Sequence, residues 1–103
     1  MRDSDSELLR RSAAGDEPAF AELYDRHHAG IHRFAWFLGG SAGVAEEVTQ
    51  EVFLALIREP GQFDPARGTL AAFLCGIARN LVRKHLARDR RLVPRLNDLV
   101  ICG

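Results

Sequence analysis

The feature that most constrains the fold is the spacing of the apolar residues, which recur three and four positions apart along almost the whole chain. No stretch alternates apolar and polar side chains with the period of two that is typical of a half-buried strand. With 103 residues, of which 47% are hydrophobic, the chain has room for one domain with a packed core. The sequence therefore predicts an all-α fold, a compact bundle of three to four helices.

Capping residues and helix breakers divide this pattern into four helices. Before each stretch stands a residue whose side-chain oxygen can accept a hydrogen bond from a free backbone N–H group. These residues are Ser4 or Asp5, Asp16, Ser41 and Thr69. The predicted helices span about residues 6–14, 17–38, 42–58 and 70–91. Their inward-facing stripes include Tyr24 and Leu38 in the second helix and His85 in the fourth.

One helical domain is expected over residues 1–91, followed over residues 92–103 by a linker or short C-terminal segment with a proline and no long period. No apolar run approaches the roughly 20 residues of a membrane-spanning helix, and the first residues are charged where a secretion signal is apolar. The two cysteines are too few for a disulfide framework or a metal knuckle. We therefore expect a cytoplasmic protein that does not contact a membrane.

Charge is unevenly distributed, although the net charge is zero. Residues 1–65 hold 6 Lys and Arg against 12 Asp and Glu, whereas residues 66–103 hold 8 against 2. An acidic front and a basic back are typical of a protein that meets two partners of opposite charge. They are equally compatible with a dipolar surface that has no partner.

Enzyme chemistry finds little support in the sequence, which has no glycine-rich phosphate loop, nucleophile elbow or HExxH motif. His28 and His32 have the spacing of metal ligands, but no cysteine or further histidine stands at a companion distance, which favours ordinary core and surface histidines. Cys75 falls beside an apolar stripe and is expected to be a small core residue rather than a nucleophile. The sequence therefore predicts no catalytic residue, no metal and no cofactor.

The basic back half points to nucleic acid. In the fourth predicted helix, polar side chains lie off the apolar stripe and one turn apart, which aligns cations along a phosphate backbone and places an amide near a base edge. These side chains are Arg79, Asn80, Arg83, Lys84 and Arg88. A basic face that is merely solvated is the alternative.

The loop before this helix strengthens the nucleic-acid hypothesis. Arg67 and Thr69 lead into a helix N-terminus, where backbone N–H groups suit a phosphate. Phe63 stands between two prolines, either as a stacking platform for an unpaired base or as an apolar plug under the loop. The sequence does not decide between these two roles.

Taken in order, the motifs resemble a known family. The segments DEPAFAELYDRHHAGIHRFAW, EEVTQEVFLAL and TLAAFLCGIARNLVRKHLARDRR are similar to region 2 of bacterial sigma factors of the extracytoplasmic-function (ECF) group, in the sigma-70 family. The resemblance covers about residues 6–91. It implies a helical domain that takes part in transcription initiation and is not an enzyme.

The first partner that the resemblance implies is the RNA polymerase core. The third predicted helix corresponds to the region that docks on the coiled coil of the β′ clamp, where carboxylates suit basic clamp residues. The positions that match the family pattern are Glu46, Glu47, Gln50, Glu51 and Leu54. Glu47 stands where many relatives have aspartate.

The second implied partner is the −10 promoter element. Relatives hold an extracted base in the loop before the fourth helix and grip the non-template strand with that helix. This assigns DNA contacts to Phe63, Arg67, Thr69, Arg79, Asn80, Arg83, Lys84 and Arg88. Primary sigma factors place a tryptophan pair near the start of this helix, where this chain has Ala71, Ala72 and Phe73. DNA melting is therefore expected to depend on base capture more than on an aromatic wedge.

An anti-sigma factor is a further expected partner, because sigma factors of this group are often held by one. Nothing after residue 91 is long enough for the second helical domain with which relatives read the −35 element. The competing hypothesis is a helical protein-interaction module that binds no DNA and presents its acidic residues and Leu54 to a partner helix.

Overall fold

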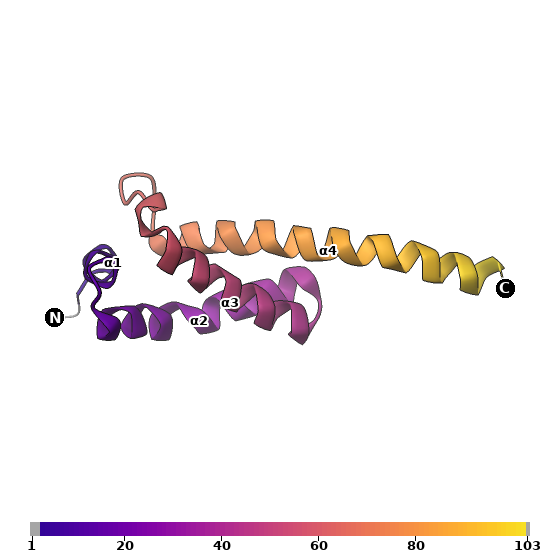
Figure 1. Cartoon of the computed structure of the whole chain (residues 1–103), viewed down its shortest axis with the longest axis horizontal. Helices are drawn as coiled ribbons and strands as arrows, with labels where there is room; N and C mark the ends of the chain where they lie inside the picture. The colour runs from indigo at the N-terminus through magenta and orange to yellow at the C-terminus, as the bar shows by residue number, and fades with distance from the viewer. Residues whose placement is uncertain (1–2, 103) are drawn as a thin grey trace.

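The computed structural model describes the backbone of residues 3–102 and the side chains of residues 3–88. Within these residues the chain forms helices and no strand, which confirms the all-α prediction (Figure 1). The elements are α1 (Asp5–Ala13), α2 (Glu17–Gly39), α3 (Ala42–Arg58), the short 3-10 helix η1 (Pro60–Gln62) and α4 (Leu70–Cys102). In Figure 1, α1 lies across the start of α2, and α3 crosses between α2 and α4.

The predicted capping residues begin the helices. Each accepts a hydrogen bond from the backbone N–H group three residues further on, which satisfies one of the free donors of the first turn. The pairs are Ser4 with Glu7 at 3.1 Å, Asp16 with Ala19 at 3.2 Å, Ser41 with Val44 at 3.1 Å, and Thr69 with Ala72 at 3.1 Å. The boundaries of α1, α2 and α3 therefore lie within one residue of the prediction.

Two glycines form the tight turn between α2 and α3. Gly40 has a φ of +71°, in the left-handed region that favours glycine, and its N–H donates to the Trp36 carbonyl oxygen at 2.7 Å. A Cβ atom on Gly39 would lie 2.9 Å from Cγ1 of Val44, which is closer than real Cβ contacts. The turn therefore brings α3 back against α2 at a distance that only glycine permits.

The hydrophobic core lies where α2, α3 and α4 meet. Its most buried large side chains are Leu23, Val48, Val52, Leu56, Leu70, Leu74 and Val82. On α3 the core also takes Ala45, Thr49 and Phe53, because this helix packs against both α2 and α4 and buries a wider face. Cys75 lies beside this core, and burial raises the pKa of its thiol, as expected for a core residue rather than a nucleophile.

Two residues of the expected inward stripe of α2 are exposed instead. Tyr24 is 39% and Leu38 36% exposed, so their assignment to the core was wrong. The reason is geometric, because α2 buries a narrow line that contains Ala19, Leu23 and Ile31. The Tyr24 ring lies at the edge of that line and covers Phe53, with the ring centroids 4.8 Å apart.

A cluster of partly buried ion pairs holds α1 against the first half of α2. Asp5 accepts from Nη1 of Arg26 at 3.1 Å and lies 2.9 Å from Nε2 of His27. At the junction of the two helices, Arg11 donates to Asp16 at 3.0 Å. Hydrogen bonds from Arg11 and from the Ala19 N–H group hold the pKa of Asp16 below its ordinary value, so the cap stays ionised in mildly acidic solution.

The last helix extends further than expected. The sequence pattern placed its end near Arg91, whereas the backbone of α4 stays helical to Cys102, through the segment expected to be a linker or short C-terminal segment. The proline at position 94 was one reason to expect a linker or a short terminal segment there. A proline removes one backbone hydrogen bond, but its neighbours are mostly leucine, valine and arginine, which a helix accommodates. No helix in the described part of the chain is both long and apolar enough to span a bilayer.

Candidate nucleic-acid interface and protein-docking face

The loop between η1 and α4 is ordered by its own hydrogen bonds. The Asp64 carboxylate accepts from the Ala66 N–H group at 2.9 Å, and the Asp64 carbonyl oxygen accepts from the Arg67 N–H group at 3.0 Å. Gln62 donates from Nε2 to Glu59 at 2.7 Å. The loop therefore presents Arg67 from a closed turn rather than from an open strand.

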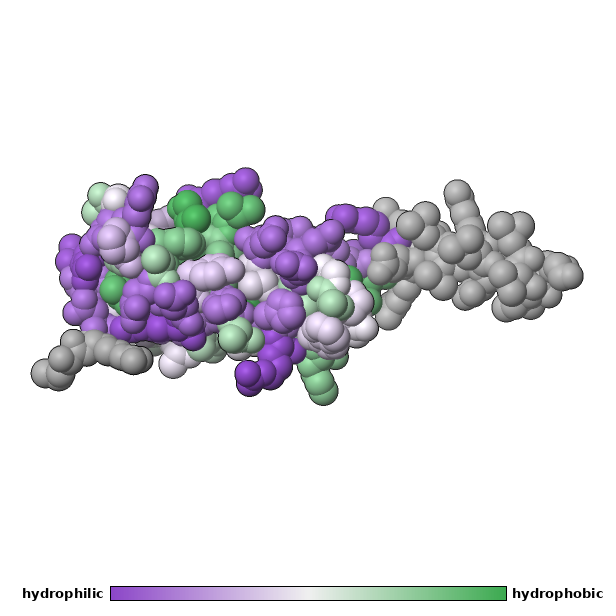
Figure 2. Space-filling model, turned by 90° about the horizontal axis from the view of Figure 1, so that it is seen from below, coloured by the Kyte–Doolittle hydropathy of each residue, from purple (hydrophilic) through white to green (hydrophobic). Residues whose placement is uncertain are grey.

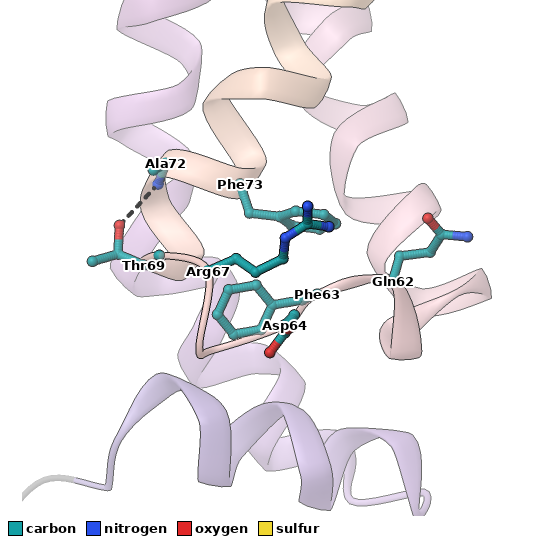
Figure 3. A pocket seen from close by; sticks show the side chains of 8 residues that line it. Gln62, Phe63, Asp64, Arg67, Thr69, Ala72 and Phe73 are labelled. Atoms are coloured by element: carbon teal, nitrogen blue, oxygen red, sulfur yellow. Dashed lines mark hydrogen bonds between the residues drawn. The ribbon is translucent and has the colours of Figure 1, made fainter.

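A hollow of about 300 Å³ lies between this loop and the first turn of α4. It is lined by Gln62, Phe63, Asp64, Arg67, Gly68, Thr69, Ala72 and Phe73. Figure 3 shows the side chains of Phe63, Arg67 and Phe73 gathered around the hollow, while that of Gln62 points away. The volume is at the lower end of the range for small-molecule sites, and the lining combines two aromatic rings with one guanidinium and one carboxylate.

Phe63 is half-buried and has features of both roles that the sequence left open. Its ring packs against the core and against Phe73, with the centroids 5.5 Å apart, as expected of a plug. The same ring lines the hollow, as expected of a platform. On its other side, a second hollow of about 250 Å³ separates it from Leu9 and Arg10 of α1. The Phe63 ring is therefore held by the core and by Phe73, and the rest of it borders the two hollows.

The first turn of α4 borders this hollow, and Thr69 already pairs two of its backbone donors. The Thr69 hydroxyl accepts from the Ala72 N–H group, and the Thr69 carbonyl oxygen accepts from Phe73 at 3.1 Å (Figure 3). Thr69 thus acts first as a helix cap. Because a helix N-terminus carries partial positive charge, the first turn of α4 and Arg67 favour an anionic group, whereas the Asp64 carboxylate in the same lining opposes one.

Beyond the hollow, α4 presents the predicted basic face to solvent. Its members Arg79, Asn80, Arg83, Lys84 and Arg88 are all exposed. They lie opposite the buried line of Leu74, Ala78 and Val82 on the same helix. Among the side chains of residues 3–88, none of these cations has a carboxylate within 4.0 Å. Their charges are therefore available to a phosphate backbone.

The predicted acidic face lies on α3. Its members Glu46, Glu47, Gln50, Glu51 and Leu54 are exposed. Leu54 is 46% exposed and Ile57, one turn away from it, is 53% exposed. Two apolar side chains beside carboxylates are typical of a face that binds a protein rather than only water.

His85, on the buried side of α4, contacts the acidic face of α3, and the sequence did not predict this contact. It was expected in the core stripe of α4, and its side chain is only 9% exposed. Its Nδ1 lies 3.5 Å from a Glu47 oxygen and its Nε2 lies 3.6 Å from a Glu51 oxygen. The two carboxylates are one turn apart on α3, so the imidazole lies between them. The one signal in the sequence was a titratable residue within an otherwise apolar stripe.

The structure brings together some predicted site residues and not others. Phe63, Arg67 and Thr69 share one hollow, and the five α4 residues follow it on the same helix. The acidic residues lie on a different helix, and only Glu47 and Glu51 contact α4, through His85. The hollow also takes Ala72 and Phe73, which the sequence did not assign to the DNA-contact residues.

Comparison with known families agrees with this arrangement. Residues 23–92 match the model of sigma-70 region 2. The chain belongs to the sigma-70 region 2 family. The matched part of this region 2 domain begins inside α2 and ends inside α4, so it contains the hollow, the acidic face and the basic face.

Curated relatives of the region 2 domain are ECF sigma factors. The domain is 38% identical over 92 residues to the ECF RNA polymerase sigma factor BldN of Streptomyces coelicolor, a match that covers 85% of this chain and 35% of the relative. It is 38% identical over 71 residues to the ECF RNA polymerase sigma factor SigK of Mycobacterium tuberculosis (strain H37Rv), covering 69% of this chain and 38% of the relative. The chain therefore spans a little over a third of the length of these relatives.

Proposed function

We propose that this region 2 domain acts in transcription initiation by joining the RNA polymerase core to the −10 element of a promoter. The observation that carries the proposal is that the hollow at Phe63 and Arg67 lies at the start of α4 and that exposed cations follow it on the same helix, beginning at Arg79. A single DNA strand fits such a track, because a flipped base needs a lined hollow and its neighbouring phosphates need cations. The relatives are named as RNA polymerase sigma factors, which supports the same role.

The energetics of base capture require help from the polymerase. Flipping a base out of a duplex costs a few kcal/mol, and stacking it on an aromatic ring returns about 1–3 kcal/mol. Phosphate contacts add a share that depends on salt. Since these terms nearly cancel, the isolated domain binds duplex DNA weakly and prefers single strands. In the proposed complex, the polymerase positions the domain and supplies the remaining affinity.

The acidic face of α3 is the proposed docking surface for the coiled coil of the β′ clamp. Carboxylates on one helix face complement a basic partner, and Leu54 adds an apolar contact at their side. A protein that works on the polymerase acts inside the cell, and an anti-sigma factor is a further proposed partner. The acidic face alone would also serve an interaction module without DNA, which is the competing candidate.

The test of docking is a binding assay between the domain and core polymerase. We expect the wild-type domain to form a stable complex, and the double variant Gln50→Ala, Glu51→Ala to weaken it about tenfold or more, because unpaired clamp cations would remain in the interface. Asp25→Ala is the matched control, since Asp25 is an exposed carboxylate on α2. A wild-type domain that forms no complex would favour the interaction module, and an unaffected double variant would place docking on another face.

The role of Phe63 is tested by two substitutions that separate packing from stacking. Phe63→Leu keeps an apolar side chain over the core but removes the aromatic ring, so we expect near-normal thermal stability. Its affinity for a single-stranded −10 oligonucleotide is expected to fall about fivefold or more. Phe63→Ala is expected to lower both quantities. Phe37→Ala, which removes an exposed ring of α2, serves as the control. If Phe63→Leu retains wild-type affinity, the ring is a plug and not a platform.

A further inference from the structure

The outer face of the second half of α2 carries an aromatic patch that the proposed function does not use. A shallow hollow of about 700 Å³ is lined there by His28, Ala29, His32, Arg33, Trp36 and Phe37. Phe37 is 84% and Trp36 48% exposed, which is unusual for rings of this size. Every lining residue belongs to α2 itself, so no other helix contributes to the patch.

Figure 2 views the molecule from the side on which α2 lies and shows scattered green and pale side chains among mostly hydrophilic ones. Along α2, the patch comes directly after the place where Asp5 of α1 contacts Arg26 and His27.

The patch is lined by a positively charged side chain and by no negatively charged one. No carboxylate lines the hollow, and the sequence has no Asp or Glu between Asp25 and Glu46. Arg33 is exposed, and two imidazoles accompany it. The surroundings are therefore neutral to basic, although the first 65 residues as a whole are acidic. A partner with carboxylates near its apolar contacts is complementary to this surface.

We propose that this patch docks an amphipathic helix of another protein, with bulky apolar residues one turn apart and Asp or Glu beside them. The lining residues recur at His28, His32 and Trp36, four positions apart, so the patch runs along about two turns of α2, roughly 12 Å. This spacing matches the i, i+4 anchors of a helix packed alongside. The ring centroids of His32 and Trp36 lie 6.0 Å apart, and these two rings form the middle of the patch.

Nucleic acid fits this patch less well than a protein helix. Aromatic rings can stack on bases, but affinity for a strand grows with the number of cations that meet its phosphates. The patch has one guanidinium, that of Arg33. The basic face of α4 carries four permanent cations and a lined hollow beside them.

The experiment is a selection from a displayed library of helical peptides of about 20 residues, followed by fluorescence titration. Trp36 is the only tryptophan of the chain, so its emission reports directly on the patch. We expect the selected peptides to carry apolar residues at i and i+4 flanked by Asp or Glu, and to shift the Trp36 emission to shorter wavelength. Phe37→Ala is expected to weaken a selected peptide about tenfold, because exposed aromatic anchors dominate such contacts.

Charge reversal and a matched control complete the design. Arg33→Glu is expected to weaken the acidic peptide and to strengthen a version with Lys in place of Asp and Glu. Arg58→Ala removes an exposed side chain on α3 outside both proposed binding faces and is expected to leave the affinity unchanged. Circular dichroism checks that each variant keeps its helices.

Four results would overturn the proposal. Selected peptides that are rich in Lys and Arg would contradict the charge argument, and equal binding by Phe37→Ala would place the contact elsewhere. An emission shift that depends on the concentration of the domain alone would identify a second copy of the chain as the occupant. A single-stranded oligonucleotide that shifts the emission at lower concentration than the peptides would identify nucleic acid instead.

Discussion

Raising the salt concentration from about 50 to about 200 mM is expected to weaken the binding of a single-stranded −10 oligonucleotide to the isolated domain about 100-fold. The reason is the release of condensed counterions from each phosphate that a cation meets. Five cations lie on the proposed track: Arg67, Arg79, Arg83, Lys84 and Arg88. For single strands, five such contacts give a slope of about −3.5 in the logarithm of the binding constant against the logarithm of salt.

The double variant Arg83→Ala, Lys84→Ala tests whether these side chains supply the slope. Losing two contacts is expected to reduce its magnitude by about 1.4, so that the same change of salt costs about 20-fold. Fluorescence anisotropy with a labelled oligonucleotide at several salt concentrations measures both slopes. Arg33→Ala, on the far end of α2, is the control and keeps the wild-type slope.

Two outcomes would contradict this assignment. A slope that the double variant leaves unchanged would mean that phosphates meet other cations. Tight, sequence-specific binding of duplex DNA by the free domain would mean that strand separation needs no polymerase, contrary to the near-balance of base flipping and stacking.

The second large effect is expected from Leu74→Ala, which should lower the free energy of unfolding by about 2–5 kcal/mol. Leu74 is completely buried on α4, in the core shared with α2 and α3. Removing its branched end loses the transfer free energy of the buried atoms and leaves a cavity that the three helices fill only in part. For a domain of about 100 residues, this corresponds to a fall in melting temperature of roughly 10–30 °C.

Urea unfolding followed by far-ultraviolet circular dichroism measures this loss. Ile57→Ala is the matched control, because Ile57 is also a branched apolar residue but is 53% exposed. The control is expected to change the free energy of unfolding by no more than about 0.5 kcal/mol. Equal effects of the two substitutions would show that Leu74 does not lie in the cooperative core.

Local chemistry explains which parts of the fold were predictable. Ser41, Asp16 and Thr69 are followed by periodic apolar residues, and a cap acts within one turn, so the starts of the helices could be derived from neighbouring residues alone. The end of α4 was not predictable in this way, because Pro94 weakens a helix without always ending it. The wider buried face of α3 depends on packing against two partners, which periodicity does not describe.

The residues of the candidate site also divide into those that local chemistry predicts and those that depend on packing between helices. Exposed cations and loop residues such as Arg83 and Arg67 can be recognised from residue type and spacing, because their chemistry does not depend on a neighbour. The place of His85 between Glu47 and Glu51 depends on the register of α4 against α3, which no local pattern specifies. The contact between Phe73 and Phe63 was not predictable from a local pattern either, because Phe73 lies on α4 and Phe63 lies in the loop before it.

The hollow opens at the first turn of α4, and the cations follow on that same uninterrupted helix. In the proposed complex, α4 therefore fixes the distances between the hollow and the cations. From Thr69 to Arg88 the spacing is set by a rise of about 1.5 Å per residue, and a helix cannot stretch to suit another strand geometry. Inserting one residue after Ala78 would lengthen the distance between the hollow and the cations that follow, and it would also rotate these cations by about 100° around the helix axis. We therefore expect related proteins that share this arrangement to keep the number of residues between the positions of Thr69 and Arg88 constant.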